Sequence, residues 1–197
     1  AAVPNIYLKT TPDMKPAFKN STLLLVEREM PTCNTNLKEY ISEMRDLFNL
    51  VQYFIKKQKI IAGHDCSDGG IFGCVMEMAF AGNTGVCINI PHQIKEEDAN
   101  TFLIREVSGF IIQVPNSELP IVYNTLEKHA NKHVHVNLYP IGVPLWYDKV
   151  IIQHGVDPNM RNFNQQSKKK VYYTHDMTYL RNRWESTSRR LELLQCN

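Results

Sequence analysis

Short apolar runs of strand length alternate along this chain with longer segments that have helical periodicity. The run at residues 22–28 has the length of a strand and stops at a polar break that contains Pro and Asn. Residues 37–57 follow, and their apolar positions recur at spacings of three and four, which places them on one helical face. Because strands alternate with helices in this way, the sequence predicts an α+β fold. We expect a two-layer α/β sandwich, with helices packed on a mixed sheet.

The other elements follow from the same two patterns. Asn34 or Thr35 is the expected N-cap of the helix at 37–57, and Ser117 is a candidate cap further along the chain. Gly82 and Asn83 are typical of a helix end. Strands are expected at 59–65, 85–90, 109–115, 133–143 and 149–155, and helices at 71–82, 96–107, 117–132 and 174–195.

The sequence divides into three segments. Residues 1–20 contain Pro and Lys and form a lead-in, and residues 21–156 carry the alternating strands and helices of one subdomain. Residues 157–197 combine a polar, turn-rich linker with a final helix. Because the first residue is not Met, we expect the chain to be a fragment of a longer protein.

Charge and cysteine usage exclude several classes of protein. The net charge of +2 argues against a protein built mainly to hold nucleic acid. No apolar run approaches the roughly 20 residues of a membrane helix, and the first residues lack the pattern of a secretory signal. The five cysteines are an odd number without a C-x-x-C pair, which favours reduced thiols. We therefore expect a cytoplasmic protein.

Residues 60–86 are the segment most suggestive of chemistry. A predicted buried strand delivers His64 and Asp65 to its carboxyl end, and residues 67–70 (SDGG) then open a helix. Helix N-termini suit phosphate because their N–H groups are unpaired, and glycine permits close backbone approach. An aspartate beside phosphate is typical of a magnesium site, because Mg²⁺ takes one or two carboxylates together with phosphate oxygens.

A purely structural explanation of this segment stays open, in which Ser67 or Asp68 caps the helix and the glycines only make the turn. Two better-known motifs do not fit. An EF-hand loop needs a side-chain ligand where Gly69 stands and Glu where Met76 stands. The glycine-rich signatures of P-loop and dinucleotide-binding proteins are absent.

Residues 64–70 (HDCSDGG) and 77–82 (EMAFAG) together resemble a long motif of the formylglycinamide ribonucleotide amidotransferase family, also called phosphoribosylformylglycinamidine synthases. In that family the motif H-D-x-S-D-G-G…E-M-A-F-A-G lies in the second half of the synthase domain. Residues 11–15 (TPDMK) resemble the lead-in to the same half, and residues 180–195 resemble the tryptophan-bearing helix before the glutaminase domain of single-chain members. The resemblance spans nearly the whole chain.

The resemblance implies the fold of the C-terminal domain of aminoimidazole ribonucleotide synthetase-like proteins, followed by a connector helix. The family converts formylglycinamide ribonucleotide to an amidine with ATP, Mg²⁺ and ammonia from glutamine. By motif position, Asp65 would bind Mg²⁺, and Ser67, Gly69 and Gly70 would form the nucleotide-binding turn for ATP or ADP. The implied partners are the remaining synthase and glutaminase domains. No catalytic residue is expected in this chain.

The sequence departs from the family pattern at two places. A Gly-Gly-Ser segment usually follows the first strand, and here PTCNTN stands in its place. The family often has adjacent acidic residues before the strand that matches 109–115, whereas Arg105, Glu106, Val107 and Ser108 precede it here. Both departures concern contacts on the substrate side.

Other reactive residues receive weaker assignments. His129, His133 and His135 lack an acidic or Cys partner for a four-ligand metal site and are expected at the surface. Lys168–Lys170 and the arginines of the last helix are expected to form a solvated face. Cys66 is close to His64 in sequence, but the family's glutaminase thiol belongs to another domain, so no nucleophilic role is assigned to it.

Three functions follow as hypotheses. The first is a Mg-nucleotide-binding subdomain of an ATP-dependent C–N ligase, inactive as an isolated chain because the rest of the site is missing. The second is a non-catalytic nucleotide-binding or scaffold module of the same fold. The third, a nucleic-acid binder with a basic tail, requires salt-dependent binding through Lys168–Lys170.

Overall fold

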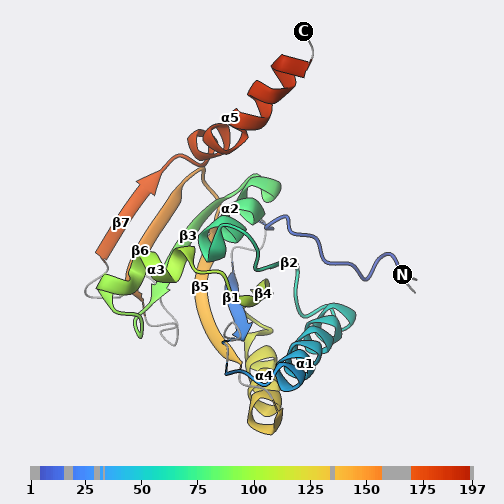
Figure 1. Cartoon of the computed structure of the whole chain (residues 1–197). Helices are drawn as coiled ribbons and strands as arrows, with labels where there is room; N and C mark the ends of the chain where they lie inside the picture. Colours follow the sequence, from blue (N-terminus) through green and yellow to red (C-terminus); the bar gives the residue numbers. More distant parts are fainter. Residues whose placement is uncertain are drawn as a thin grey trace.

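A computed structural model describes residues 5–15, 20–28, 32, 34–133, 136–156 and 170–195, and the side chains of all of these except 129–133 and 156. In this part of the chain, seven strands form one sheet in the order β2-β4-β1-β5-β3-β6-β7 (Figure 1). The pair β3/β6 is parallel and the other neighbours are antiparallel. The elements are β1 (Ser21–Arg28), α1 (Leu37–Lys56), β2 (Ala62–Asp65), α2 (Gly70–Gly82), β3 (Gly85–Pro91), a 3-10 turn (Glu96–Asp98), α3 (Ala99–Ile104), β4 (Ser108–Pro115), α4 (Leu119–His133), β5 (Asn137–Leu145), β6 (Val150–Val156), β7 (Lys170–His175) and α5 (Met177–Gln195).

Strand β1 lies inside the sheet and is buried on both faces. Leu23 and Leu25 pack in the core formed with α2 and α3, whereas Leu24 and Val26 pack in the core formed with α1 and α4. A strand covered on both faces reads as a continuous apolar run, which explains the sequence of this strand. The predicted α+β class and mixed sheet are confirmed, and at β1 the helices lie on both faces of the sheet.

Most predicted elements are found, with differences at their ends. The N-cap of α1 is Asn36, whose side chain accepts a hydrogen bond from the Lys38 amide at 3.2 Å, so the predicted caps Asn34 and Thr35 are wrong by one or two positions. Asn83 ends α2 in the left-handed conformation, as expected. The helix predicted at 96–107 is shorter and ends at Ile104, because the next residues lead into β4.

Strand β2 is an edge strand, which corrects the prediction that it is buried. It pairs only with β4 among the described strands, and of its four residues only Ala62 is buried. Its apolar flank at Ile60 and Ile61 made the segment resemble an interior strand. The consequence is that β2 leads to a solvent-accessible end at Asp65.

The last strand, β7, was missed by the sequence analysis, which assigned residues 170–173 to no strand. It pairs antiparallel with β6 and extends the sheet before α5 begins. Arg181 of α5 donates to the Asn83 side chain at 2.9 Å and to the Phe80 carbonyl oxygen, which anchors the start of α5 at the C-terminus of α2. Beyond this contact α5 projects from the body of the molecule (Figure 1). The division of the chain at residue 156 stays a prediction.

Because β1 is buried on both faces, shortening one of its core side chains should lower the stability of the protein strongly. The change Leu25→Ala should lower the free energy of unfolding by about 3 kcal/mol, because it removes a fully buried side chain and leaves a cavity. Urea denaturation followed by circular dichroism measures this. The same change at Leu194 on the exposed part of α5 is the control and should shift stability by less than about 0.5 kcal/mol. Equal losses at both positions would contradict the described core.

Candidate functional site

The segment that joins β2 to α2 is a tight turn fixed by backbone contacts. The Cys66 amide donates to the Gly109 carbonyl at 2.9 Å, and the Gly70 amide donates to the Ser67 carbonyl at 3.1 Å. Gly69 and Gly70 have φ values of 86° and 68°, in the left-handed region that favours glycine. A Cβ on Gly70 would lie 2.4 Å from the Ile104 carbonyl oxygen. The turn therefore requires glycine at position 70 for both conformation and space.

The residues predicted to bind ligands lie together at this turn. The Asp65 side chain is 73% exposed and ends β2, while Ser67 is half-buried and Gly69 is exposed. Gly70 is buried and begins α2. The structure thus places Asp65, Ser67, Gly69 and Gly70 in one continuous turn with its acidic end open to solvent.

His64 links the two halves of the sequence motif. Its Nε2 lies 3.2 Å from a carboxylate oxygen of Glu77 on α2, and its Nδ1 lies 3.5 Å from a carboxylate oxygen of Asp65. From the sequence, His64 was placed at the end of its strand without a partner, and Glu77 was not singled out. The signal was present, because Glu77 begins the EMAFAG half of the motif. The His64 ring holds β2 and α2 together and orients the Asp65 side of the turn.

Two thiols meet beneath the turn. The Ser67 amide donates to the Cys74 sulfur at 3.3 Å, and the Ser67 hydroxyl lies 3.8 Å from the same sulfur. The hydrogen bond with the Cys66 thiol lowers the pKa of Cys74 to about 6, and the Ser67 contacts act in the same direction. That same hydrogen bond, together with burial, raises the pKa of Cys66. When one of the two thiols is ionised, the negative charge is therefore favoured on Cys74.

The neighbouring end of β1 carries two ion pairs that sequence reasoning missed. Glu27 is fully buried, and its carboxylate accepts from Arg105 at 2.7 Å. Arg28 pairs with Glu43 of α1 at 2.5 Å. Glu27 is the residue that could have indicated the first of these ion pairs, because it is a charged residue at the end of a strand buried on both faces. Each of these arginines already has a carboxylate partner, so neither presents an uncompensated positive charge to a ligand.

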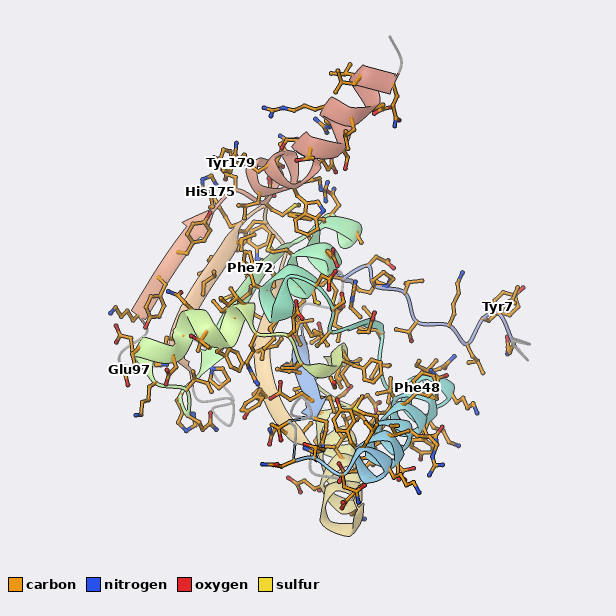
Figure 2. All side chains as sticks on the ribbon, viewed as in Figure 1. Tyr7, Phe48, Phe72, Glu97, His175 and Tyr179 are labelled. Carbon is orange, nitrogen blue, oxygen red and sulfur yellow. The ribbon has the colours of Figure 1, made fainter. Side chains whose placement is uncertain are left out.

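A cleft of about 480 Å³ lies beside the turn. Its walls come from the lead-in at Thr10 and Pro12, from α1 and from β4, and His64 and Asp65 form part of its lining. Phe48 on α1, labelled in Figure 2, contributes an aromatic surface. The lead-in is held in place because the Gly63 amide donates to the Thr11 carbonyl at 3.2 Å. Asp65 is therefore flanked by the turn on one side and by a largely apolar cleft on the other.

The described residues contain no group of three His, Cys, Asp or Glu side chains arranged to hold a metal ion. Asp65 would consequently be a single protein ligand, which suits Mg²⁺ better than zinc, since Mg²⁺ keeps several waters and completes its shell with phosphate oxygens. The Asp65 carboxylate is open to solvent and can accept such an ion. The residues present therefore fit a phosphate-bound Mg²⁺ but not a metal held by protein alone.

The other candidate residues do not join this site. The side chains of His129, His133 and His135 lie outside the described part of the chain, as do Lys168 and Lys169. Lys170 is paired with Glu96 of the 3-10 turn. Where β7 meets α5, the rings of His175 and Tyr179 stack with their centroids 4.2 Å apart. Both residues are labelled in Figure 2. None of the helices searched within the described ranges is long and apolar enough to cross a membrane.

Comparison with known proteins places this fold in a family. The domain described as AIR synthase related protein, C-terminal domain, matches residues 28–136, which is more than half of the chain. The chain belongs to this family. The resemblance indicated by its motifs is confirmed, and the observed mixed sheet with its helices agrees with the fold that the resemblance implies.

Three similar proteins illustrate the relationship. The phosphoribosylformylglycinamidine synthase of Drosophila melanogaster is 29% identical over 100% of this chain and 16% of its own length. The probable membrane antigen 75 of Saimiriine herpesvirus 2 is 37% identical over 45% of this chain and 7% of its own. The Thermotoga maritima PurL structure complexed with FGAR is 10% identical, with a TM-score of 0.64 over 89% of this chain and 30% of that one. The chain spans about a sixth or less of the length of the Drosophila synthase and of the viral antigen.

The turn geometry predicts that Gly70→Ala destabilises the protein. The free energy of unfolding should fall by more than about 2 kcal/mol, because the new Cβ meets the Ile104 carbonyl and φ is positive. Gly63→Ala is the matched control, since its Cβ makes only ordinary contacts at 3.5 Å and beyond, and it should cost less than about 1 kcal/mol. Urea denaturation compares the two. A Gly70→Ala protein as stable as Gly63→Ala would show that α2 does not pack as described.

Proposed function

We propose that this chain is the Mg-nucleotide-binding subdomain of a phosphoribosylformylglycinamidine synthase. That enzyme carries out the ATP- and glutamine-dependent conversion of formylglycinamide ribonucleotide to formylglycinamidine ribonucleotide in purine biosynthesis, and we place it in the cytoplasm. The observation that carries the proposal is the turn at the start of α2, where an exposed Asp65 adjoins Ser67 and two glycines with positive φ. The alignment with the Drosophila synthase along the whole chain supports it.

The turn has the properties that phosphate binding requires. The N-terminus of a helix carries a partial positive charge, and glycine lets a phosphate approach the backbone closely. Ser67 adds a hydroxyl that can donate to a phosphate oxygen. Thermotoga maritima PurL, which shares the fold, has been solved in complexes with ADP and with ATP. A nucleotide diphosphate or triphosphate is therefore the ligand class that we assign to this turn.

Asp65 has a separate role in the proposal. The Asp65 carboxylate would hold a phosphate-bound Mg²⁺, which would supply positive charge to neutralise the phosphates. Ser67, Gly69 and Gly70 would hold the phosphates, while His64 would position the turn through Glu77. No residue of this chain is assigned a step in bond formation.

Replacing Asp65 should separate metal-assisted nucleotide binding from folding. We expect Asp65→Asn to weaken binding of MgADP about tenfold or more, because the substitution removes the negative charge that holds the ion. The melting temperature of the Asp65→Asn variant should stay within roughly two degrees of the wild-type value, because the Asp65 side chain is largely exposed. Isothermal titration calorimetry of the chain with MgADP, and with ADP in the presence of a chelator, measures the effect.

The control for this experiment is Asp68→Asn, which removes an exposed carboxylate from the same turn. Its affinity for MgADP should match that of the wild type, since the proposal gives Asp68 no contact with the ion. Equal weakening by both substitutions would indicate a general charge effect. Unchanged affinity in Asp65→Asn, or no MgADP binding by the wild-type chain, would contradict the assignment.

A scaffold role is the second candidate function, because the chain also matches a probable membrane antigen, a relative whose name states no synthase activity. Identity to that protein is 37% over 45% of the chain, against 29% to the Drosophila synthase over the whole chain. In a scaffold, a retained nucleotide would stabilise the fold without turnover. The purified chain would then carry bound ADP or ATP, and stripping the nucleotide would lower its melting temperature. An exchangeable nucleotide whose removal leaves the fold intact favours the synthase role.

The partial coverage of the synthases predicts that the isolated chain has no synthase activity. The chain spans 16% of the Drosophila enzyme, and the proposed partners are the remaining synthase and glutaminase domains. An enzyme that works by holding its reactants together loses activity when part of the groups that position them is missing. Incubation with formylglycinamide ribonucleotide, MgATP and ammonium should therefore give no amidine product and no phosphate release. Product formation would mean that the active site is contained within these 197 residues.

A further inference from the structure

Helix α5 carries a row of apolar side chains where it extends away from the sheet (Figure 1). Their spacings of four, seven and three residues are those of the core positions of a coiled coil: Leu180, Trp184, Leu191 and Leu194. Leu180 packs against the core of the molecule, whereas Trp184, Leu191 and Leu194 are 54%, 55% and 76% exposed. We call these three exposed residues the α5 stripe.

The α5 stripe is narrow and begins at a cleft. At about 100° per residue, the row from Leu180 to Leu194 lies within about 80° of the helix circumference. The apolar face that a helix lays on a globular core or on a membrane surface is usually wider, whereas a narrow seam is typical of contact with one other helix. At the end nearest the sheet, Phe80 and Trp184 line a cleft of about 440 Å³ between α2 and α5. The shape of the stripe therefore favours a single helix as its occupant.

The charged side chains of α5 are arranged differently on its two faces. Away from the stripe, Arg189 pairs with Glu185 at 2.7 Å, so the two charges compensate each other. Arg183 and Arg190 are exposed and, by their helical positions, lie along one margin of the stripe. Within the described residues, neither of them forms an ion pair with a carboxylate. An apolar seam beside uncompensated positive charge matches a partner that has carboxylates at the facing positions.

We propose that the α5 stripe docks an acidic amphipathic helix of a partner protein. Apolar side chains of the partner helix pack on Leu191 and Leu194, and its carboxylates pair with Arg183 and Arg190. Trp184 is the central anchor, since a large aromatic side chain at the edge of a cleft is the kind of residue that dominates binding energy. The interface uses none of the residues assigned to the nucleotide, so it goes beyond the proposed function and does not depend on it.

A second copy of this chain is a poorer occupant than an acidic helix. In a pair of α5 helices, the margins of the two seams face each other. One margin carries Arg183 and Arg190, and the other carries residues 181, 188 and 195, which are Arg, Ser and Gln. Neither margin holds a carboxylate, so a second copy leaves both arginines without an ionic partner in parallel and in antiparallel pairing.

Titration of the chain with a designed peptide tests the proposal. The probe is a fluorescently labelled helix of about three heptads, with Leu at the seam positions and Glu at both margins, which keep it from pairing with itself. Fluorescence anisotropy should show binding to the wild-type chain. The double variant Leu191→Ala/Leu194→Ala should bind about tenfold more weakly or worse. Its melting temperature should not change, because both side chains are exposed.

Charge reversal shows whether the arginines select the partner. The double variant Arg183→Glu/Arg190→Glu should lose binding of the Glu-flanked peptide and should bind a peptide with Lys at the same positions, which the wild-type chain rejects. Arg189→Gln is the matched control, because it removes a positive charge away from the stripe and should bind the Glu-flanked peptide as the wild type does. Raising the salt concentration should weaken binding of the wild type.

Other occupants give different results in the same experiments. Absence of binding by the wild-type chain, or equal weakening by Arg189→Gln, would overturn the proposal. A dimer of the wild-type chain in analytical ultracentrifugation that Leu191→Ala/Leu194→Ala abolishes would assign the stripe to a second copy instead. Binding to vesicles of phosphatidylcholine and phosphatidylserine that Arg183→Glu/Arg190→Glu abolishes, without binding of the peptide, would assign it to a membrane surface.

Discussion

The position of helix α2 depends on two close backbone approaches, one at each end of the helix. At Gly70 a side chain would collide with the carbonyl oxygen of Ile104, and at Gly82 a Cβ would lie 2.1 Å from the Met14 carbonyl oxygen. Met14 belongs to the lead-in, and its amide donates to the Met78 carbonyl at 3.1 Å. These contacts fix α2 between α3 and the lead-in, so the turn ahead of α2 and the His64–Glu77 pair both follow from them. Glycine at both positions is a packing requirement that any ligand site on this turn inherits.

The sequence predicted the fold class and most elements because their patterns are local. The apolar run of β1 and the helical spacing of α1 each contain enough information within one segment. The edge position of β2 was not predictable, since it is set by pairing with β4 far along the chain. Strand β7 was missed for a related reason. Its pairing with β6 is the feature that defines it, and its exposed Val171 and Tyr172 gave no buried pattern.

The candidate site was predictable in its residues but not in its surroundings. The motif indicated Asp65, Ser67, Gly69 and Gly70, and the structure gathers them at one turn. The ion pair between Glu27 and Arg105 depends on β1 and β4 being neighbours, which no single segment encodes. It also bears on the departure seen at residues 105–108, because Arg105 has a structural partner in Glu27. The proposed synthase and scaffold roles both use this turn, and they differ in whether its nucleotide turns over.

The central claim is that the turn between β2 and α2 holds the phosphates of a nucleotide through Mg²⁺ on Asp65. A crystal structure of the chain grown with MgADP tests it most directly. The account predicts phosphate oxygens within hydrogen-bonding distance of the Ser67 hydroxyl and of the backbone amides of Asp68 or Gly69. It also predicts one Asp65 carboxylate oxygen in the coordination shell of the ion. A nucleotide bound elsewhere on the fold, or an Mg²⁺ ion held without Asp65, would contradict the account.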